Sequence, residues 1–177
     1  MLTRVLGWKR DPISPEFGDK TIVLGVPHTS IWDFAIGYFY YRSYGKKMKV
    51  MIKKESFFWP VSWILRSMGG FPVDRGNSAA LIKSLIDKAN ASDEFHLCIC
   101  PEGTRKPVKR WKTGYHLIAK ECGIPVFIGY FDWGEKRVGI TGPVELTGNA
   151  RSDTDRIQAI CEDMHLTGKY PEMFVTH

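Results

Sequence analysis

Short apolar runs alternate with longer amphipathic segments along the chain. The short runs, bounded by Gly, Pro or charged residues, predict strands at Thr21–Val26, Lys49–Ile52, Phe95–Cys100, Val126–Phe131 and Arg137–Thr141. Apolar side chains at the helical period predict helices at Trp32–Tyr41, Ser56–Ser67, Ser78–Ala91, Gly114–Cys122 and Thr154–Leu166. We also expect a turn at Gly142–Val144 into a short final strand, and the start of the last helix at Ser152–Asp155. Strands that alternate with helices favour an α/β fold.

The length and composition indicate one globular unit. A chain of 177 residues fits a single domain spanning residues 1–177, and 44% hydrophobic with 25% charged residues is typical of a folded protein. The apolar stretches are far shorter than a membrane span, and residues 1–10 lack the apolar core of a signal peptide. We therefore expect no transmembrane helix, and cysteines that stay reduced in the cytosol.

The formal net charge of +6 at pH 7 indicates an anionic partner, such as a phosphorylated small molecule, a lipid surface or a nucleic acid. The basic residues adjoin glycine turns rather than a nucleic-acid readout motif, so we expect no nucleic-acid partner. The aromatic segment Ser56–Ser67 has two interpretations. Its Trp59 and Trp63 either pack in the core or, with the neighbouring Lys54 and Arg66, rest among lipid headgroups.

One short segment combines a histidine with a carboxylate. His28 follows a predicted strand at a proline-marked turn, and Asp33 lies five residues later in the first turn of the next predicted helix. That spacing allows the carboxylate to reach back and orient the imidazole as a general base. Ser30 to Asp33 also has the S-x-x-D form of a capping box. The alternative is therefore that Asp33 only accepts hydrogen bonds from backbone N–H groups at the start of the helix.

Two further segments have residues suited to phosphate. Gly69 to Arg75 places paired glycines before an extended run, and the Arg75 guanidinium can clamp a phosphate while Asp74 holds it. Pro101 to Arg105 follows the predicted strand Phe95–Cys100, at the strand end where α/β sheets bind ligands. The alternatives are a surface ion pair in the first segment and a polar turn in the second.

Within the second segment each residue type has a possible use. Gly103 permits close backbone approach, Thr104 offers a hydroxyl and Arg105 supplies a fork of donors. Lys112 precedes a predicted helix, where an anion meets free backbone N–H groups. His96, Cys98 and Cys100 alternate along a predicted strand without an obvious fourth ligand, so we interpret them as buried side chains rather than a metal site.

Together these segments resemble the glycerolipid acyltransferases, the family of the 1-acyl-glycerol-3-phosphate and lysophospholipid acyltransferases. His28 to Asp33 resembles the H-x4-D motif of that family, Gly70 to Arg75 its second block, Pro101 to Arg105 its third and Ile124 to Val126 its fourth. The blocks stand in family order, and small, soluble-looking bacterial members of phospholipid biosynthesis look most similar. Pro27 departs from the asparagine that many members have before the histidine.

The resemblance implies a single domain with a mixed β-sheet flanked by helices, and an O-acyltransferase. His28 would take the proton from an acceptor hydroxyl, which attacks an acyl thioester directly, and Asp33 would orient His28. The thioester donor would be acyl-CoA or acyl carrier protein, with no cofactor and no metal. The acceptor phosphate would meet Arg75, Glu102, Gly103, Thr104 and Arg105, with Lys112 at the edge and Glu102 orienting its neighbours.

The resemblance also implies a location. The chain has no room before its first predicted strand for the membrane-anchoring helices of some relatives. We therefore expect a cytoplasmic protein, peripheral on the inner face of the membrane, with Ser56–Ser67 as the candidate contact surface. The alternative from another functional class is a non-catalytic protein that binds acyl chains or anionic lipid at the membrane surface.

Overall fold

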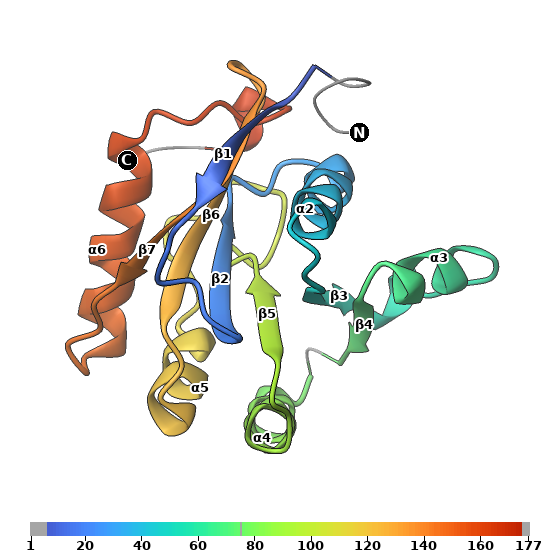
Figure 1. Cartoon of the computed structure of the whole chain (residues 1–177), viewed down its shortest axis with the longest axis vertical. Helices are drawn as coiled ribbons and strands as arrows, with labels where there is room; N and C mark the ends of the chain where they lie inside the picture. Colours follow the sequence, from blue (N-terminus) through green and yellow to red (C-terminus); the bar gives the residue numbers. More distant parts are fainter. Residues whose placement is uncertain (1–6, 75, 175–177) are drawn as a thin grey trace.

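A mixed sheet forms the centre of the protein (Figure 1). The computed structural model describes residues 7–74 and 76–174, and within them seven strands pair in the order β1-β7-β6-β2-β5-β3-β4. Strands β6, β2, β5, β3 and β4 are parallel, whereas β7 is antiparallel to β6 and parallel to β1. The strands are β1 (Lys9–Ile13), β2 (Lys20–Val26), β3 (Lys49–Lys53), β4 (Gly70–Val73), β5 (Phe95–Ile99), β6 (Val126–Asp132) and β7 (Arg137–Val144).

Helices cover both faces of this sheet, so the predicted α/β fold with a mixed sheet is confirmed. Helix α2 packs on one face and α4, α5 and α6 pack on the other (Figure 1). Among the described residues, no helix combines the length and the apolar character that a membrane span requires. The helices are α2 (Ile31–Ser43), α3 (Val61–Ser67), α4 (Ser78–Asn90), α5 (Gly114–Cys122) and α6 (Ala150–Asp163), with single 3₁₀ turns η1 (Lys54–Ser56) and η2 (Pro171–Met173).

The core has one apolar layer on each face of the sheet. Because successive side chains of a strand point to opposite faces, Ile22 and Leu24 of β2 pack toward α5 and α6, while Val23 packs toward α2. Each fully buried aliphatic side chain of this kind contributes about 1.5–3 kcal/mol to stability relative to an exposed one. Burial on both faces explains why β2 reads as a continuous apolar run.

The five predicted strands are present, and the two that the pattern did not predict lie at the two edges of the sheet. Each contains a proline, Pro12 in β1 and Pro72 in β4, and β1 also has three charged residues. Proline has no backbone N–H donor and is tolerated at sheet edges. Because it also interrupts a run of strand-forming residues, the apolar pattern did not predict these two strands. The turn predicted at Gly142–Val144 is wrong, because β7 continues to Val144, which pairs with Val126.

Two helix starts also differ from the pattern. The predicted helix Ser56–Ser67 is wrong in its first half: η1 ends at Ser56, and α3 begins at Val61 after Pro60. The last helix begins at Ala150, before the predicted Ser152–Asp155 start, because the Asn149 side chain accepts from the N–H groups of Arg151 and Ser152 at 3.1 Å each.

The parallel order of β6, β2 and β5 brings three loops to one edge of the sheet. The carboxyl end of β2 leads to His28, that of β5 leads to Glu102 and that of β6 leads to Trp133. Residues far apart in the sequence therefore meet at one edge, the usual place for ligand sites in parallel sheets.

Candidate active site

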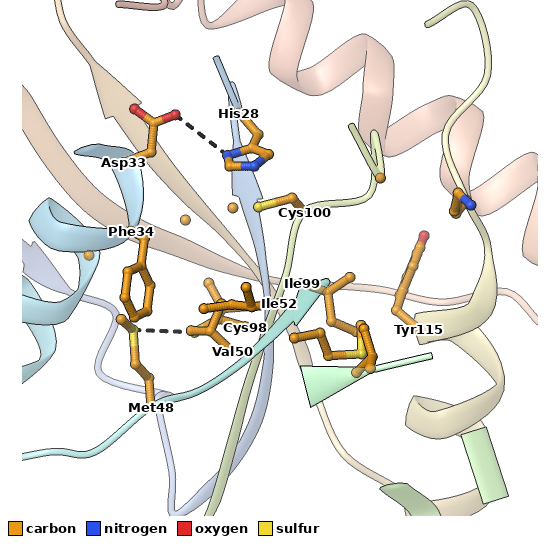
Figure 2. Close-up of a pocket in the computed structure, with 18 of the residues that line it drawn as sticks. His28, Asp33, Phe34, Met48, Val50, Ile52, Cys98, Ile99, Cys100 and Tyr115 are labelled. Atoms are coloured by element: carbon orange, nitrogen blue, oxygen red, sulfur yellow. Dashed lines mark hydrogen bonds and ion pairs between the residues drawn. The ribbon is translucent and has the colours of Figure 1, made fainter. Parts of the chain in front are cut away.

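His28 lies in the turn after β2, on the wall of a cavity of about 1370 Å³ (Figure 2). Its backbone N–H donates to the Glu102 carboxylate, with N–O distances of 2.9 Å and 3.2 Å. The side chain keeps 25% of its surface exposed, so one part of the imidazole is available to a ligand. Glu102, a residue of the third block, therefore holds the backbone of the turn, while the His28 ring faces the cavity.

Asp33 is held by several donors and also faces His28. Its Oδ2 accepts from the N–H groups of Thr29 at 2.9 Å and Ser30 at 2.7 Å, and its Oδ1 accepts from Trp133 Nε1 at 2.8 Å. The same Oδ2 lies 3.6 Å from His28 Nδ1. This contact is longer than a hydrogen bond, and catalytic contacts of this kind often tighten when substrate binds.

The capping box predicted at Ser30 is present, since the Ser30 side chain accepts from Trp32 N and Asp33 accepts from Ser30 N. The capping interpretation of Asp33 is therefore confirmed, and its orienting role stays a prediction that this geometry allows. The backbone donors fix the carboxylate at the amino end of α2, and that position leaves it beside the imidazole.

The environment of His28 changes its proton affinity. Burial acts to lower the pKa of His28, but the adjacent Cys100 sulfur and the Asp33 carboxylate outweigh it and raise that pKa above its ordinary 6.5. Figure 2 shows the Cys100 sulfur beside the imidazole ring. Because a neutral thiol has little charge, we attribute the direction of the shift mainly to Asp33. A raised pKa makes His28 a stronger base, available once it has lost its proton.

Glu102 is a buried carboxylate that serves the backbone of His28. It is only 7% exposed, and burial raises the pKa of Glu102 to about 7, although nearby His28 acts against the shift. Its oxygens accept from His28 N, and it is not among the residues that line the cavity. This placement agrees with a carboxylate that orients its neighbours.

The predicted anion-binding residues line the same cavity as His28: Gly103, Thr104, Arg105 and Lys112. Gly103 has φ +70°, and a Cβ there would lie 2.6 Å from Lys112 Cε. Glycine thus permits both the left-handed backbone and the passage of the lysine stem across the loop. The N–H of Lys112 donates to the Pro101 carbonyl at 2.8 Å, which joins the two loops.

The second and fourth motifs remain. Arg75, predicted to bind phosphate, lies outside the described residues. Its neighbour Asp74 accepts from the N–H of Gly76 at 2.8 Å. Ile124 of the fourth block is buried in the core, and Val126 of that block begins β6. The fourth block therefore contributes to the core rather than to the cavity wall.

The sequence pattern missed two residues of this site. Trp133 anchors Asp33, and the signal for it is indirect: it follows β6, whose parallel partner β2 leads to His28. Arg151 of α6 lines the cavity as a further cation, while its Nη1 donates to the Trp111 carbonyl at 3.0 Å and its Nη2 pairs with Asp155.

His96 and Cys98 of β5, and Cys100 directly after it, show no arrangement for a metal. Within residues 7–74 and 76–174, no group of three or more His, Cys, Asp or Glu side chains is placed to hold a metal ion. His96 is buried, hydrogen-bonded to Thr21 Oγ1 at 2.8 Å and stacked on Phe17. Cys98 and Cys100 are only half-buried, and both line the cavity.

Comparisons with known proteins agree with the motif order. Residues 13–128 match the family model described as Acyltransferase. The chain is 33% identical over 132 residues to a Streptococcus pneumoniae (strain ATCC BAA-255 / R6) protein named 1-acyl-sn-glycerol-3-phosphate acyltransferase. That match covers 73% of this chain and 45% of the relative, so the chain spans less than half of the relative's length. No solved structure matches the chain.

Proposed function

The chain belongs to the acyltransferase family, and from this premise we propose that it moves a fatty acyl group from a thioester donor to a hydroxyl of a phosphate-bearing lipid. The observation that carries the proposal is a single cavity lined by His28, Asp33 and the cationic side chains of Arg105 and Lys112. A base with its orienting carboxylate suits activation of a hydroxyl, and the cations suit a phosphate on the same molecule.

The proposed reaction is a direct transfer. The acceptor hydroxyl oxygen forms a bond to the thioester carbonyl carbon while its proton passes to the His28 imidazole. The C–S bond then breaks, and the departing thiolate takes the proton back from the imidazolium, leaving an ester and a free thiol. Asp33 fixes the ring and stabilises its charged form. No acyl-enzyme, cofactor or metal takes part in this scheme.

The basic side of the cavity binds the acceptor. Arg105 presents a planar fork of donors to phosphate oxygens, and Lys112 adds a point charge where its stem crosses Gly103. Thr104 contributes a hydroxyl, and Arg75 remains part of this proposal as a second guanidinium. Glu102 does not contact the phosphate in this proposal; it accepts a hydrogen bond from the His28 backbone N–H and so positions that residue.

The substrates follow from this chemistry. We expect 1-acyl-glycerol-3-phosphate as an acceptor, because the relative is named for it, and acyl-CoA or acyl carrier protein as the donor. An acceptor of this kind resides in a bilayer, so the protein is proposed to act as a peripheral protein on the inner face of the membrane.

The test measures thiol release. Purified protein is mixed with acyl-CoA, or acyl carrier protein loaded with a fatty acyl group, and 1-acyl-glycerol-3-phosphate, and the free thiol is titrated with time. We expect release that depends on the acceptor and falls about a thousandfold in His28→Ala. His165→Asn is the matched control, because His165 is exposed and has φ +48°, which asparagine tolerates. Acyl-chain binding without thiol release would instead identify a non-catalytic lipid-binding protein.

A further inference from the structure

Four large apolar side chains stand exposed around α3, and we call them the α3 patch: Phe58, Trp59, Trp63 and Ile64. Trp59 is 88% exposed and Trp63 is 75% exposed, whereas Leu65 of the same helix is buried. Helix α3 therefore packs through Leu65 and presents its larger side chains to the surroundings. Two tryptophans this exposed in one segment indicate an interaction surface.

The position of α3 leaves the patch open. Figure 1 shows α3 beyond the β3–β4 edge of the sheet, projecting away from the layer of α4, α5 and α6. Its contacts are chiefly with β4, the edge strand. A segment at that place is free to approach a large flat partner without a clash from the rest of the fold.

The charges beside the α3 patch are mostly positive. Residues 53–67 contain three cations, Lys53, Lys54 and Arg66, and one carboxylate, Glu55. The Glu55 Oε2 atom lies 3.6 Å from Lys53 Nζ, and the Arg66 guanidinium lies 5.2 Å from the centre of the Phe57 ring. Basic side chains beside exposed tryptophans complement a surface that is apolar inside and anionic at its headgroups.

The α3 patch also borders the cavity that contains His28. Phe58 is 60% exposed and still lines that cavity, so it stands at an opening. Val61 and Leu65 continue the apolar wall inward from it. On another part of the wall, Ile31 is 59% exposed as well. An acyl chain is thus able to pass from an apolar exterior into the cavity along apolar side chains.

We propose that the α3 patch docks on an anionic lipid bilayer and turns the cavity opening toward it. Trp59 and Trp63 enter the boundary between headgroups and acyl chains, while Lys54 and Arg66 meet anionic headgroups. The inference rests on the proposed function, because a lipid substrate gives the opening its purpose. A bilayer fits better than a protein partner, since the patch, the cations and an apolar cavity opening adjoin one another.

The first test is vesicle flotation of the whole chain. Vesicles of phosphatidylcholine containing phosphatidylglycerol are compared with vesicles of phosphatidylcholine alone. We expect the double variant Trp59→Ala/Trp63→Ala to bind the anionic vesicles at least about tenfold more weakly than the unaltered protein. Leu117→Ala is the control, because Leu117 is a half-exposed apolar residue of α5 that does not line the cavity. It should bind within about twofold of the unaltered protein.

A charge variant separates the two contributions. Lys54→Gln/Arg66→Gln should weaken binding to the anionic vesicles about thirtyfold, which corresponds to about one kcal/mol per cation, and leave binding to phosphatidylcholine nearly unchanged. Equal binding of the unaltered protein and the tryptophan double variant overturns the proposal. So does a dimer in lipid-free solution that the tryptophan substitutions dissociate while vesicle binding persists, because the occupant is then a second copy.

The second test separates docking from chemistry. With a short-chain acceptor dissolved as monomers, the tryptophan double variant should turn over within about twofold of the unaltered protein, whereas with the acceptor embedded in vesicles it should lose about tenfold. An equal loss on both acceptors overturns docking. His28→Ala should bind vesicles like the unaltered protein, so absence of turnover from every acceptor refutes the proposed function while flotation still decides the docking.

Discussion

Residues 7–74 and 76–174 contain two His–Asp pairs whose surroundings differ. His28 Nδ1 lies 3.6 Å from Asp33 Oδ2 at the wall of the cavity, with the imidazole 25% exposed. His116 Nε2 of α5 lies 2.9 Å from Asp153 Oδ2 of α6, with 4% and 1% of the side chains exposed. The tighter pair is enclosed between two helices, and the looser pair faces the space where a ligand fits.

The two carboxylates are held in similar ways, so the difference lies in the histidines. Asp33 accepts from backbone N–H groups before α2, and Asp153 accepts from Thr147 N at 2.8 Å and Thr147 Oγ1 at 2.8 Å. Both are helix-start carboxylates with an imidazole nearby. The geometry teaches that a His–Asp contact alone does not indicate chemistry. The proposed function rests instead on an accessible imidazole that lines the same cavity as two cations.

The largest contrast is expected from alanine at each histidine. His28→Ala should lower turnover about a thousandfold and leave the free energy of unfolding nearly unchanged, because the imidazole is 25% exposed and its 3.6 Å contact with Asp33 is longer than a hydrogen bond. His116→Ala should lower the free energy of unfolding by about 2 kcal/mol, because it removes one hydrogen bond to the buried Asp153 carboxylate, which keeps its bonds from Thr147 and Arg156. Turnover per folded His116→Ala molecule should stay near normal. Denaturant titrations and thiol release measure both, and similar losses of turnover would remove the distinction.

The pH dependence of turnover sharpens the contrast at Asp33. The pKa of His28 is raised, so the neutral base accumulates, and turnover rises, as pH increases through that value. Asp33→Asn removes the carboxylate that raises it, so the midpoint of the rise should move about one unit lower and maximal turnover should fall about a hundredfold. The measurement is kcat/KM against pH for both proteins. An unmoved midpoint with an unchanged fold would show that Asp33 is only a cap.

The stability of the enclosed pair also rises with pH, but over a more acidic range. Burial acts to raise the pKa of Asp153, but hydrogen bonds from His116, Thr147 and Arg156 outweigh it and lower that pKa below 3.8. Stability from the charged carboxylate is therefore complete above its unfolded pKa and is lost as pH falls through the lower folded pKa. Asp153→Asn should cost about 2 kcal/mol at neutral pH. It should also flatten the decline of stability below about pH 4, which acid unfolding curves would test.

The sequence predicts local features of this molecule better than those that join distant segments. The period of apolar residues predicts β2 and α5, and the first and third motifs predict two segments that line the cavity, because these signals lie within short stretches. The edge strands escape prediction because their prolines break the pattern. His116 and Asp153 are 37 residues apart, and only the packing of α5 against α6 makes them a pair.

Trp133 makes another such distant contact, because 100 residues separate it from Asp33. It also stacks edge-on with Trp8, and the Lys169 ammonium lies 4.8 Å from its ring centre. Nothing in the local sequence indicates that its indole N–H holds a carboxylate. The parallel strands β2 and β6 bring the two segments together. A substitution that removes only the indole N–H of Trp133 therefore tests how far this single hydrogen bond matters to Asp33.

The smallest expected effect comes from removing that donor alone. Trp133→Phe keeps an aromatic ring but removes the hydrogen bond of 2.8 Å to Asp33 Oδ1, so the carboxylate is less firmly aimed at His28. A bond to a charged group contributes about 1.5–3 kcal/mol, and we expect kcat to fall about tenfold with little change in the KM of the acceptor. Trp32→Phe is the control, because Lys169 also lies 5.1 Å from the Trp32 ring centre and Asp33 Oδ1 accepts from Trp133 instead. Equal losses of kcat in both variants would show that the effect comes from the contact of the rings with Lys169 and not from the orientation of Asp33.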